Sequence, residues 1–260
     1  MDFFVTLYQE IFFKPLFNGL IGLTAVLPFH DLGLAIIILT ILVRFIIFPF
    51  THRSIITQIK MKEIEPHIRN IREQFKNNQA EIARKTMELY KEHGVSPFSG
   101  CLLVIAQFPV LIALYHVFLN EIAPRAGFLY SFIQFPDTIN MSFLGLINLG
   151  HTSIVIALLA AASQFIQMRL AIPPKPAQKV KKEENSKPDF SSMFSSQAQY
   201  IFPFFIFFIS FRFPAALGLY WTTSNIFAIL HESLVRRKAR LFYDRQGKAD
   251  TNPKNNIVTH

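Results

Sequence analysis

Long apolar runs, separated by segments that hold most of the charged residues, dominate the pattern of this 260-residue chain. Five runs of about 18 to 22 residues are each long enough for a helix across about 30 Å of hydrocarbon. The pattern therefore predicts an all-α membrane protein with five transmembrane helices, at residues 32–51, 97–119, 151–170, 193–211 and 214–235.

The segment 1–31 is also apolar, but it is interrupted by Glu10, Lys14, Pro15 and Pro28. These interruptions favour an N-terminal interfacial helix over a further transmembrane helix. Asp2 and Glu10 lie where a signal peptide would carry basic residues, so we expect residue 1 to begin the mature chain.

Composition supports a membrane protein. Hydrophobic residues make up 51% of the chain, including 29 phenylalanines, against 17% charged residues. That is more apolar surface than one soluble core of this length requires. The single cysteine, Cys101, excludes an intramolecular disulfide and a four-thiolate metal site.

The basic residues predict the orientation, because cytoplasmic loops carry the excess of Lys and Arg. Nine lie between Arg53 and Lys91, five between Lys175 and Lys187, and seven between Arg236 and Lys254. The external loop 120–150 and the corner 212–214 hold only Arg125 and Arg212. We therefore expect the N-terminus outside and the C-terminus in the cytoplasm.

The cytoplasmic segments differ in pattern. In 52–96, apolar residues recur at helical spacing (Ile64, Ile68, Ile71 and Phe75), which predicts an antiparallel helical hairpin, with a solvated spacer as the alternative. The cytoplasmic linker 171–192 belongs to a polar stretch, 173–196, that we expect to be disordered. We expect the same of the basic cytoplasmic tail, 236–260, after Arg245.

Arg44 is the sharpest single feature. It lies about six residues from the cytoplasmic end of its run, or roughly 9 Å deep. An arginine in a helix centre costs about 2.5 to 3.5 kcal/mol, which favours a watery cavity or a partner. The alternative is snorkelling to the headgroups. Thr40 lies one turn earlier on the same face, and we expect no acidic residue within the spans to neutralise the cation.

Polar residues recur in the other spans. Gln107 precedes Pro109 in the second, and Ser163, Gln164 and Gln167 cluster in the third. In the fifth, Tyr220 and Trp221 are followed by the polar run Thr222, Thr223, Ser224 and Asn225. Interhelical hydrogen bonding is the better interpretation of the third-span cluster.

Several of these segments resemble the YidC/Oxa family of membrane protein insertases, in the short form without a large external domain. Residues 33–44 resemble the family's first core span, including its arginine and the threonine one turn before. The resemblance covers Leu16 to Arg237, and its further matches are residues 60–66, 89–91, 97–101, 107–109, 113–115, 143–145 and 213–221, with Ser224 and Asn225.

The resemblance implies five helices around a hydrophilic groove that is open to the cytoplasm and to lipid. The implied function is insertion and assisted folding of membrane proteins in the bacterial plasma (inner) membrane, without nucleotide hydrolysis. The groove residues would be Arg44, Thr40, Gln107, Tyr220, Trp221, Ser224 and Asn225. The implied partners are nascent membrane proteins, the bilayer, the Sec translocon and the ribosome.

The basic tail leaves two alternatives open. Its cluster of Arg236, Arg237, Lys238 and Arg240 is suited to anionic lipid headgroups or to ribosomal RNA.

No chemical step is expected. The sequence has no G-x-x-x-x-G-K and no H-E-x-x-H motif, and we expect neither a catalytic residue nor a metal nor a cofactor. A secondary transporter is the rival class, but it predicts internal repeats, and none is evident. A membrane-bound enzyme is a third possibility, disfavoured because no paired catalytic groups are present.

Overall fold

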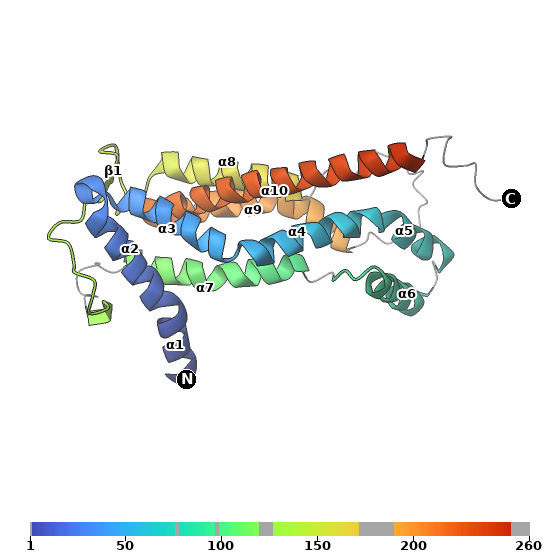
Figure 1. Cartoon of the computed structure of the whole chain (residues 1–260), viewed down its shortest axis with the longest axis horizontal. Helices are drawn as coiled ribbons and strands as arrows, with labels where there is room; N and C mark the ends of the chain where they lie inside the picture. Colours follow the sequence, from blue (N-terminus) through green and yellow to red (C-terminus); the bar gives the residue numbers. More distant parts are fainter. Residues whose placement is uncertain (1, 76–77, 97–98, 120–126, 172–189, 251–260) are drawn as a thin grey trace. The chain divides into compact units, whose positions relative to one another are not determined.

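The computed structural model describes residues 2–75, 78–96, 99–119, 127–171 and 190–250. The chain forms two compact units. The first contains residues 1–47 and 105–229, and the second contains residues 48–104 and 230–260. Figure 1 shows the helices that build each unit.

The first unit begins with a helical segment that continues through Pro15. Helix α1, Asp2–Tyr8, runs into the π-helical turn η1, Gln9–Phe13, and then into α2, Lys14–Val26. Proline lacks the N–H that an α-helix requires, and a π-helical turn is one way to accommodate such a local defect. The sequence pattern suggested that Pro15 interrupts the helical segment. In the structure the segment instead continues through Pro15.

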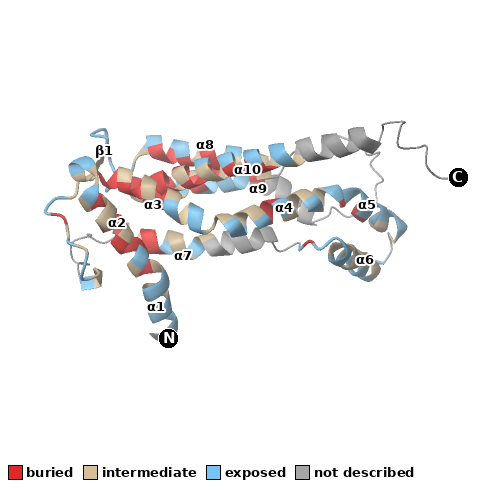
Figure 2. Cartoon of the chain, viewed as in Figure 1, coloured by how far each residue is buried: buried red, intermediate tan, exposed pale blue. Residues whose placement is uncertain are grey.

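Helix α2 turns its apolar face to protein. Phe17, Leu20 and Ile21 are fully buried, in one core with Leu32 and Val117. Protein therefore covers the apolar face of α2, and the interfacial placement of residues 1–31 stays a prediction. In α1, by contrast, the apolar residues are largely exposed, as Figure 2 shows.

Helix α3, Leu32–Ile46, is shorter than the apolar run that predicted it. The chain breaks at Ile47 and resumes as α4, Phe48–Glu63. Pro49 explains the break, because it has no N–H to donate to the carbonyl of Phe45. Arg44 consequently lies in the last turn of its helix, not six residues before the end. A cation is favourable there because it faces the negative end of the helix dipole.

A small β-hairpin, which the all-α prediction did not include, lies against the start of α3. Strand β1, Ser142–Phe143, pairs with β2, Ile147–Asn148, in antiparallel register. The hairpin lies so close to α3 that a Cβ on Gly33 would be 2.2 Å from Cδ2 of Phe143. Glycine is therefore required at position 33 for this approach.

The remaining helices of the first unit include most of α7, Ser99–Leu119, and all of α8, Ile154–Ala171. They are followed by α9, Phe190–Arg212, and by the first part of α10, Ala215–Asp250, whose residues 230–250 belong to the second unit. Helices α8 and α9 lie side by side (Figure 1). The α10 backbone comes so close to α8 that a Cβ on Gly218 would lie 2.6 Å from Cγ2 of Ile156.

Two predictions of disorder are wrong in part. Residues 190–196 belong to α9, and α10 continues past Arg245 to Asp250. Both polar stretches adjoin apolar helices, and extending an existing helix avoids the unfavourable nucleation step. The rest of the predicted disordered stretches, 173–189 and 251–260, lies outside the described residues.

The second unit contains the predicted helical hairpin. Helix α5, Glu65–Gln74, packs against α6, Gln79–Glu92. Their small core contains Ile64, Ile68 and Val95, packed against Met61, Leu89 and Tyr90. Of the four residues that predicted the seam, Ile64 and Ile68 form it, while Ile71 and Phe75 are only half-buried.

The exposed surface of α8 is apolar, and its buried face, apart from Ile156, is small or polar. Ile154, Val155, Leu158, Leu159 and Ile166 are about half exposed, whereas Ala157, Ala160, Ser163 and Gln164 are buried. This arrangement is typical of helices packed in lipid, where small and polar residues mediate contact between helices.

Among the described helices, α8 alone is both long and apolar enough to cross a membrane by itself. The pair α3 and α4 passes the same test only as one interrupted span. The apolar parts of α7 and α9, Gln107–Phe118 and Gln199–Arg212, are shorter. The count of five spans therefore stays a prediction.

Candidate functional site

The polar residues of α10 lie on two different faces of the helix. Tyr220 and Ser224 are four residues apart and share one face, and Trp221 and Asn225 share the next. Because consecutive helical residues are rotated by about 100°, the two pairs meet different neighbours. This division separates the predicted groove residues into two groups.

Tyr220 is at the centre of the first group. Its hydroxyl oxygen accepts a hydrogen bond from Nε2 of Gln107 on α7, and Ser224 lies one turn further along the same face of α10. Arg44 of α3 interacts with Tyr220 electrostatically. Three helices, α3, α7 and α10, therefore bring their polar side chains to one place.

Arg44 is half-buried. Within the part of the chain that the structure describes, it has neither a hydrogen bond nor an ion pair. The expectation that no span holds an acidic residue was wrong, because Glu232 lies within 214–235. That carboxylate does not serve Arg44, however, because Glu232 Oε1 pairs with Arg236 at 2.6 Å.

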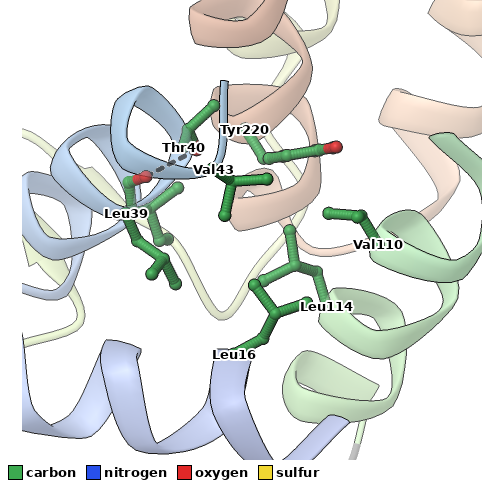
Figure 3. Close-up of a pocket in the computed structure, with 8 residues that line it drawn as sticks. Leu16, Leu39, Thr40, Val43, Val110, Leu114 and Tyr220 are labelled. Atoms are coloured by element: carbon green, nitrogen blue, oxygen red, sulfur yellow. Dashed lines mark hydrogen bonds between the residues drawn. The ribbon is translucent and has the colours of Figure 1, made fainter. Parts of the chain in front are cut away.

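Thr40 is buried, and its hydroxyl donates to the carbonyl oxygen of Ile36 at 2.6 Å. With Tyr220 it lines a cavity of about 10 Å³, whose other walls are aliphatic side chains of α2, α3 and α7 (Figure 3). This volume is close to the minimum for one water molecule. Thr40 therefore faces the same cavity as Tyr220, but its hydroxyl donates its hydrogen bond to the backbone of its own helix.

The second group faces α8. The indole Nε1 of Trp221 donates to Oε1 of Gln164 at 2.8 Å. The side-chain nitrogen of Asn225 donates to the same oxygen at 3.2 Å and to Oγ of Ser163 at 3.1 Å. The prediction that the polar cluster of this span makes interhelical hydrogen bonds is confirmed. Trp221 and Asn225 thus join α10 to α8, apart from the group around Arg44.

Asp31 is a residue that the sequence reasoning missed. It is buried, and its Oδ1 accepts from the backbone N–H groups of Gly33 and Leu34 at 2.7 and 3.1 Å, which caps α3. The available signal was its position immediately before the apolar run, where helix-capping residues are preferred.

The basic cluster of the tail lies on the helical extension of α10. Arg236 is paired with Glu232, whereas Arg237 and Lys238 are exposed. The side chain of Arg240 lies outside the described residues. Of the described residues of this cluster, Arg237 and Lys238 are therefore the two exposed cations.

A larger cavity, of about 720 Å³, lies in the first unit between the N-terminal helix and α7. Its lining is mostly aromatic and aliphatic, with Phe4, Phe13, Phe108 and Ile112 among the residues. The polar contact at its wall is between the hydroxyl of Tyr8 and Nδ1 of His116, 3.1 Å apart.

Taken together, apolar helices with polar contacts turned inward define a helical integral membrane protein. Residues 24–241 match the family described as "60Kd inner membrane protein". The chain belongs to this family, which confirms the resemblance to YidC and its relatives.

Individual relatives agree with this assignment. The chain is 33% identical over 199 residues to a membrane protein insertase YidC of Clostridium tetani, covering 76% of this chain and 79% of the relative. It is 30% identical over 209 residues to a YidC of Fusobacterium nucleatum, covering 80% and 87%.

A solved structure shares the fold. It is described as an active YidC insertase with the first transmembrane domain resolved, and it matches with a TM-score of 0.51 and 19% identity. The match covers 86% of this chain and 45% of that one.

Proposed function

We propose that this protein is a membrane protein insertase, which moves short polar segments of nascent membrane proteins across the bilayer and assists their folding. The observation that carries the proposal is Arg44, a cation in an apolar helix with no ion pair among the described residues. Family membership supports the same function.

The physical task explains why such a cation is useful. A substrate helix gains free energy on entering lipid, but its polar flank must cross hydrocarbon in which unpaired backbone groups are costly. A hydrophilic groove open to the cytoplasm shortens the dry path. A cation within it attracts acidic residues of the translocated segment, and this attraction is strong where the effective dielectric constant is low.

The residues around Tyr220 are proposed to form the polar wall of this groove. Gln107 donates a hydrogen bond to the Tyr220 hydroxyl, and Tyr220 interacts with Arg44. Ser224 lies one turn from Tyr220, and Thr40 lies one turn from Arg44. Trp221 and Asn225, also predicted to line the groove, are proposed to support it through their bonds to α8.

Five spans, with the N-terminus outside and the C-terminus in the cytoplasm, are proposed as the topology. The distribution of Lys and Arg supports this orientation. The apolar exposed face of α8 supports contact with lipid. The proposed location is a bacterial inner membrane, in keeping with the family description.

No nucleotide hydrolysis is proposed. Partitioning of the substrate helix into lipid supplies free energy, and the membrane potential adds about 2.3 kcal/mol per elementary charge per 100 mV. The proposed partners are nascent membrane proteins and the bilayer, with the Sec translocon and the ribosome as further partners. Arg237 and Lys238 are available for either ribosomal RNA or anionic lipid.

The test is insertion of a single-span protein with an acidic external segment into proteoliposomes that contain the purified protein. Arg44→Ala should reduce insertion about tenfold or more, and Arg44→Lys should retain most of it, because charge is the property required. Arg169 is a matched control, as an exposed arginine in the last turn of α8. Arg169→Ala should insert like wild type.

Two results would contradict the proposal. Wild-type proteoliposomes that insert no more than empty liposomes would exclude an insertase. Saturable uptake of a small solute by the same vesicles would instead favour the transporter class.

A further inference from the structure

Gln164 lies on the buried face of α8 and is the acceptor for two side chains of α10. Its Oε1 accepts from Trp221 at 2.8 Å and from Asn225 at 3.2 Å. Its Nε2 donates to Oε1 of Gln167, one turn further along α8, at 3.3 Å. A single buried amide therefore joins two donors of the neighbouring helix.

Most polar side-chain groups at the contact between α8 and α10 already have a hydrogen-bond partner. Asn225 also donates to Oγ of Ser163 at 3.1 Å, and the Ser163 hydroxyl donates a hydrogen bond to the carbonyl oxygen of Ala160 at 2.9 Å. In an apolar environment a donor that loses its acceptor is costly. Rotating α10 relative to α8 would leave the Trp221 indole N–H and the Asn225 amide without partners.

The hydrophobic effect alone specifies this rotation weakly. Lipid tails are as apolar as the side chains of the helices, so the hydrophobic effect does not choose which face of α10 meets α8. Directional hydrogen bonds do choose, because they require particular residues to face each other. The contacts of Gln164 are of this directional kind.

The rotation of α10 also determines where Tyr220 points. Trp221 and Asn225 each follow a residue of the other face, Tyr220 and Ser224, by one position. When Trp221 and Asn225 are held against α8, the preceding residues are turned toward Gln107 and Arg44. The two faces move as one body because they belong to one helix.

We propose that Gln164 is a positioning residue for insertion, which fixes the rotation of α10 and so keeps Tyr220 beside Arg44. This inference rests on the proposed insertase function. Gln164 acts through Trp221 and Asn225 and is not itself assigned contact with the substrate.

Trp221 provides a direct optical readout, because it is the single tryptophan of the chain. Its fluorescence reports the partner of the indole N–H without interference from other tryptophans. The probe and the hydrogen bond under test are therefore in the same side chain.

The experiment compares wild type with Gln164→Leu, Gln164→Glu and the control Gln167→Leu in proteoliposomes. Gln167 is bonded to Gln164, and no bond joins it to a described residue of α10. Each variant receives two single-span substrates, one with an acidic external segment and one with its carboxylates replaced by amides. The ratio of acidic to neutral insertion is the activity readout.

Gln164→Leu should lower this ratio about fivefold, because it removes the shared acceptor of two interhelical hydrogen bonds. It should also shift the Trp221 emission maximum. Gln164→Glu retains acceptor oxygens and should restore both readouts, and Gln167→Leu should leave both near wild type. Trp221→Phe, which removes the indole donor together with part of the ring system, is a second variant in case Gln164→Leu does not fold, and should lower the ratio two- to threefold.

An unchanged ratio in a folded Gln164→Leu, with or without a shift in emission, would overturn the inference and leave Gln164 a packing residue. An unchanged ratio in Trp221→Phe would do the same if Gln164→Leu does not fold. If wild type inserts neither substrate above empty liposomes, the proposed function itself fails and the inference falls with it.

Discussion

The carboxylate of Asp31 accepts a hydrogen bond from the backbone N–H of Leu144 at 2.9 Å, through the oxygen that does not cap α3. One buried side chain thus caps a helix and anchors a loop 113 residues further along the chain. Leu144 and Gly145 both have positive φ, so this turn is a conformation that needs support. The start of α3 and the β-hairpin therefore form one local structure.

Asp31→Ala should lower the free energy of unfolding by about 2 to 3 kcal/mol, because it removes a helix cap and leaves buried N–H groups without an acceptor. Thermal unfolding in detergent measures this change. Asp137→Ala, at an exposed aspartate of the same connection, is the control and should change stability by less than about 0.5 kcal/mol. Equal losses in both variants would contradict the role of Asp31.

Gly218→Ala should be destabilising by about 1 to 3 kcal/mol, because the added Cβ would lie 2.6 Å from Cγ2 of Ile156. In the double variant Gly218→Ala, Ile156→Ala the clash is absent, so its loss of stability should be smaller than the sum of the two single losses. Gly127→Ala, where no atom lies within 4 Å of the added Cβ, should be nearly neutral. The midpoint of thermal unfolding is the measurement, and an unaffected Gly218→Ala would exclude the close contact.

Tyr220→Phe should reduce insertion of the acidic substrate about threefold, with less effect on the neutral one. It removes the hydroxyl that accepts a hydrogen bond from Gln107 near Arg44, and bonds of this kind contribute about 0.6 kcal/mol on average and about 1.7 kcal/mol at most. The control is Tyr200→Phe, because Tyr200 is exposed on α9. Equal insertion of both substrates by Tyr220→Phe and wild type would remove Tyr220 from the proposed groove.

The pKa of Glu81 on α6 lies below its ordinary value, because Arg84 donates a hydrogen bond to its carboxylate. A lowered carboxyl pKa stabilises the helix above the ordinary value of about 4.3 and loses that effect as pH falls through the lowered pKa. NMR titration of Glu81 should show a higher pKa in Arg84→Gln than in wild type. Lys91→Gln, at another exposed cation of α6, should leave it unchanged.

Helix existence was largely predictable from the apolar runs, but helix ends were not. The break at Ile47 follows from Pro49, which the sequence displays, yet the apolar pattern continued through it and suggested one helix to residue 51. The π-helical turn before Pro15 shows the opposite case, in which a proline did not end the helix.

The candidate site was predictable as a set of polar residues, but its internal division was not. Arg44, Thr40, Gln107, Tyr220 and Ser224 meet in one region, whereas Trp221 and Asn225 turn to α8. Helical periodicity already separates residues 220 and 221 by about 100°. Which neighbour each face meets depends on how α10 packs against other helices.

By itself the sequence determined the membrane class and the family, and it predicted the positions of the apolar helices and the orientation. These properties depend on composition and spacing along one chain. The tertiary structure alone decided that α2 is buried, that Asp31 joins α3 to a distant hairpin, and that Gln164 receives Trp221 and Asn225. Such contacts link residues far apart in the chain, and their distances become defined only when the helices pack.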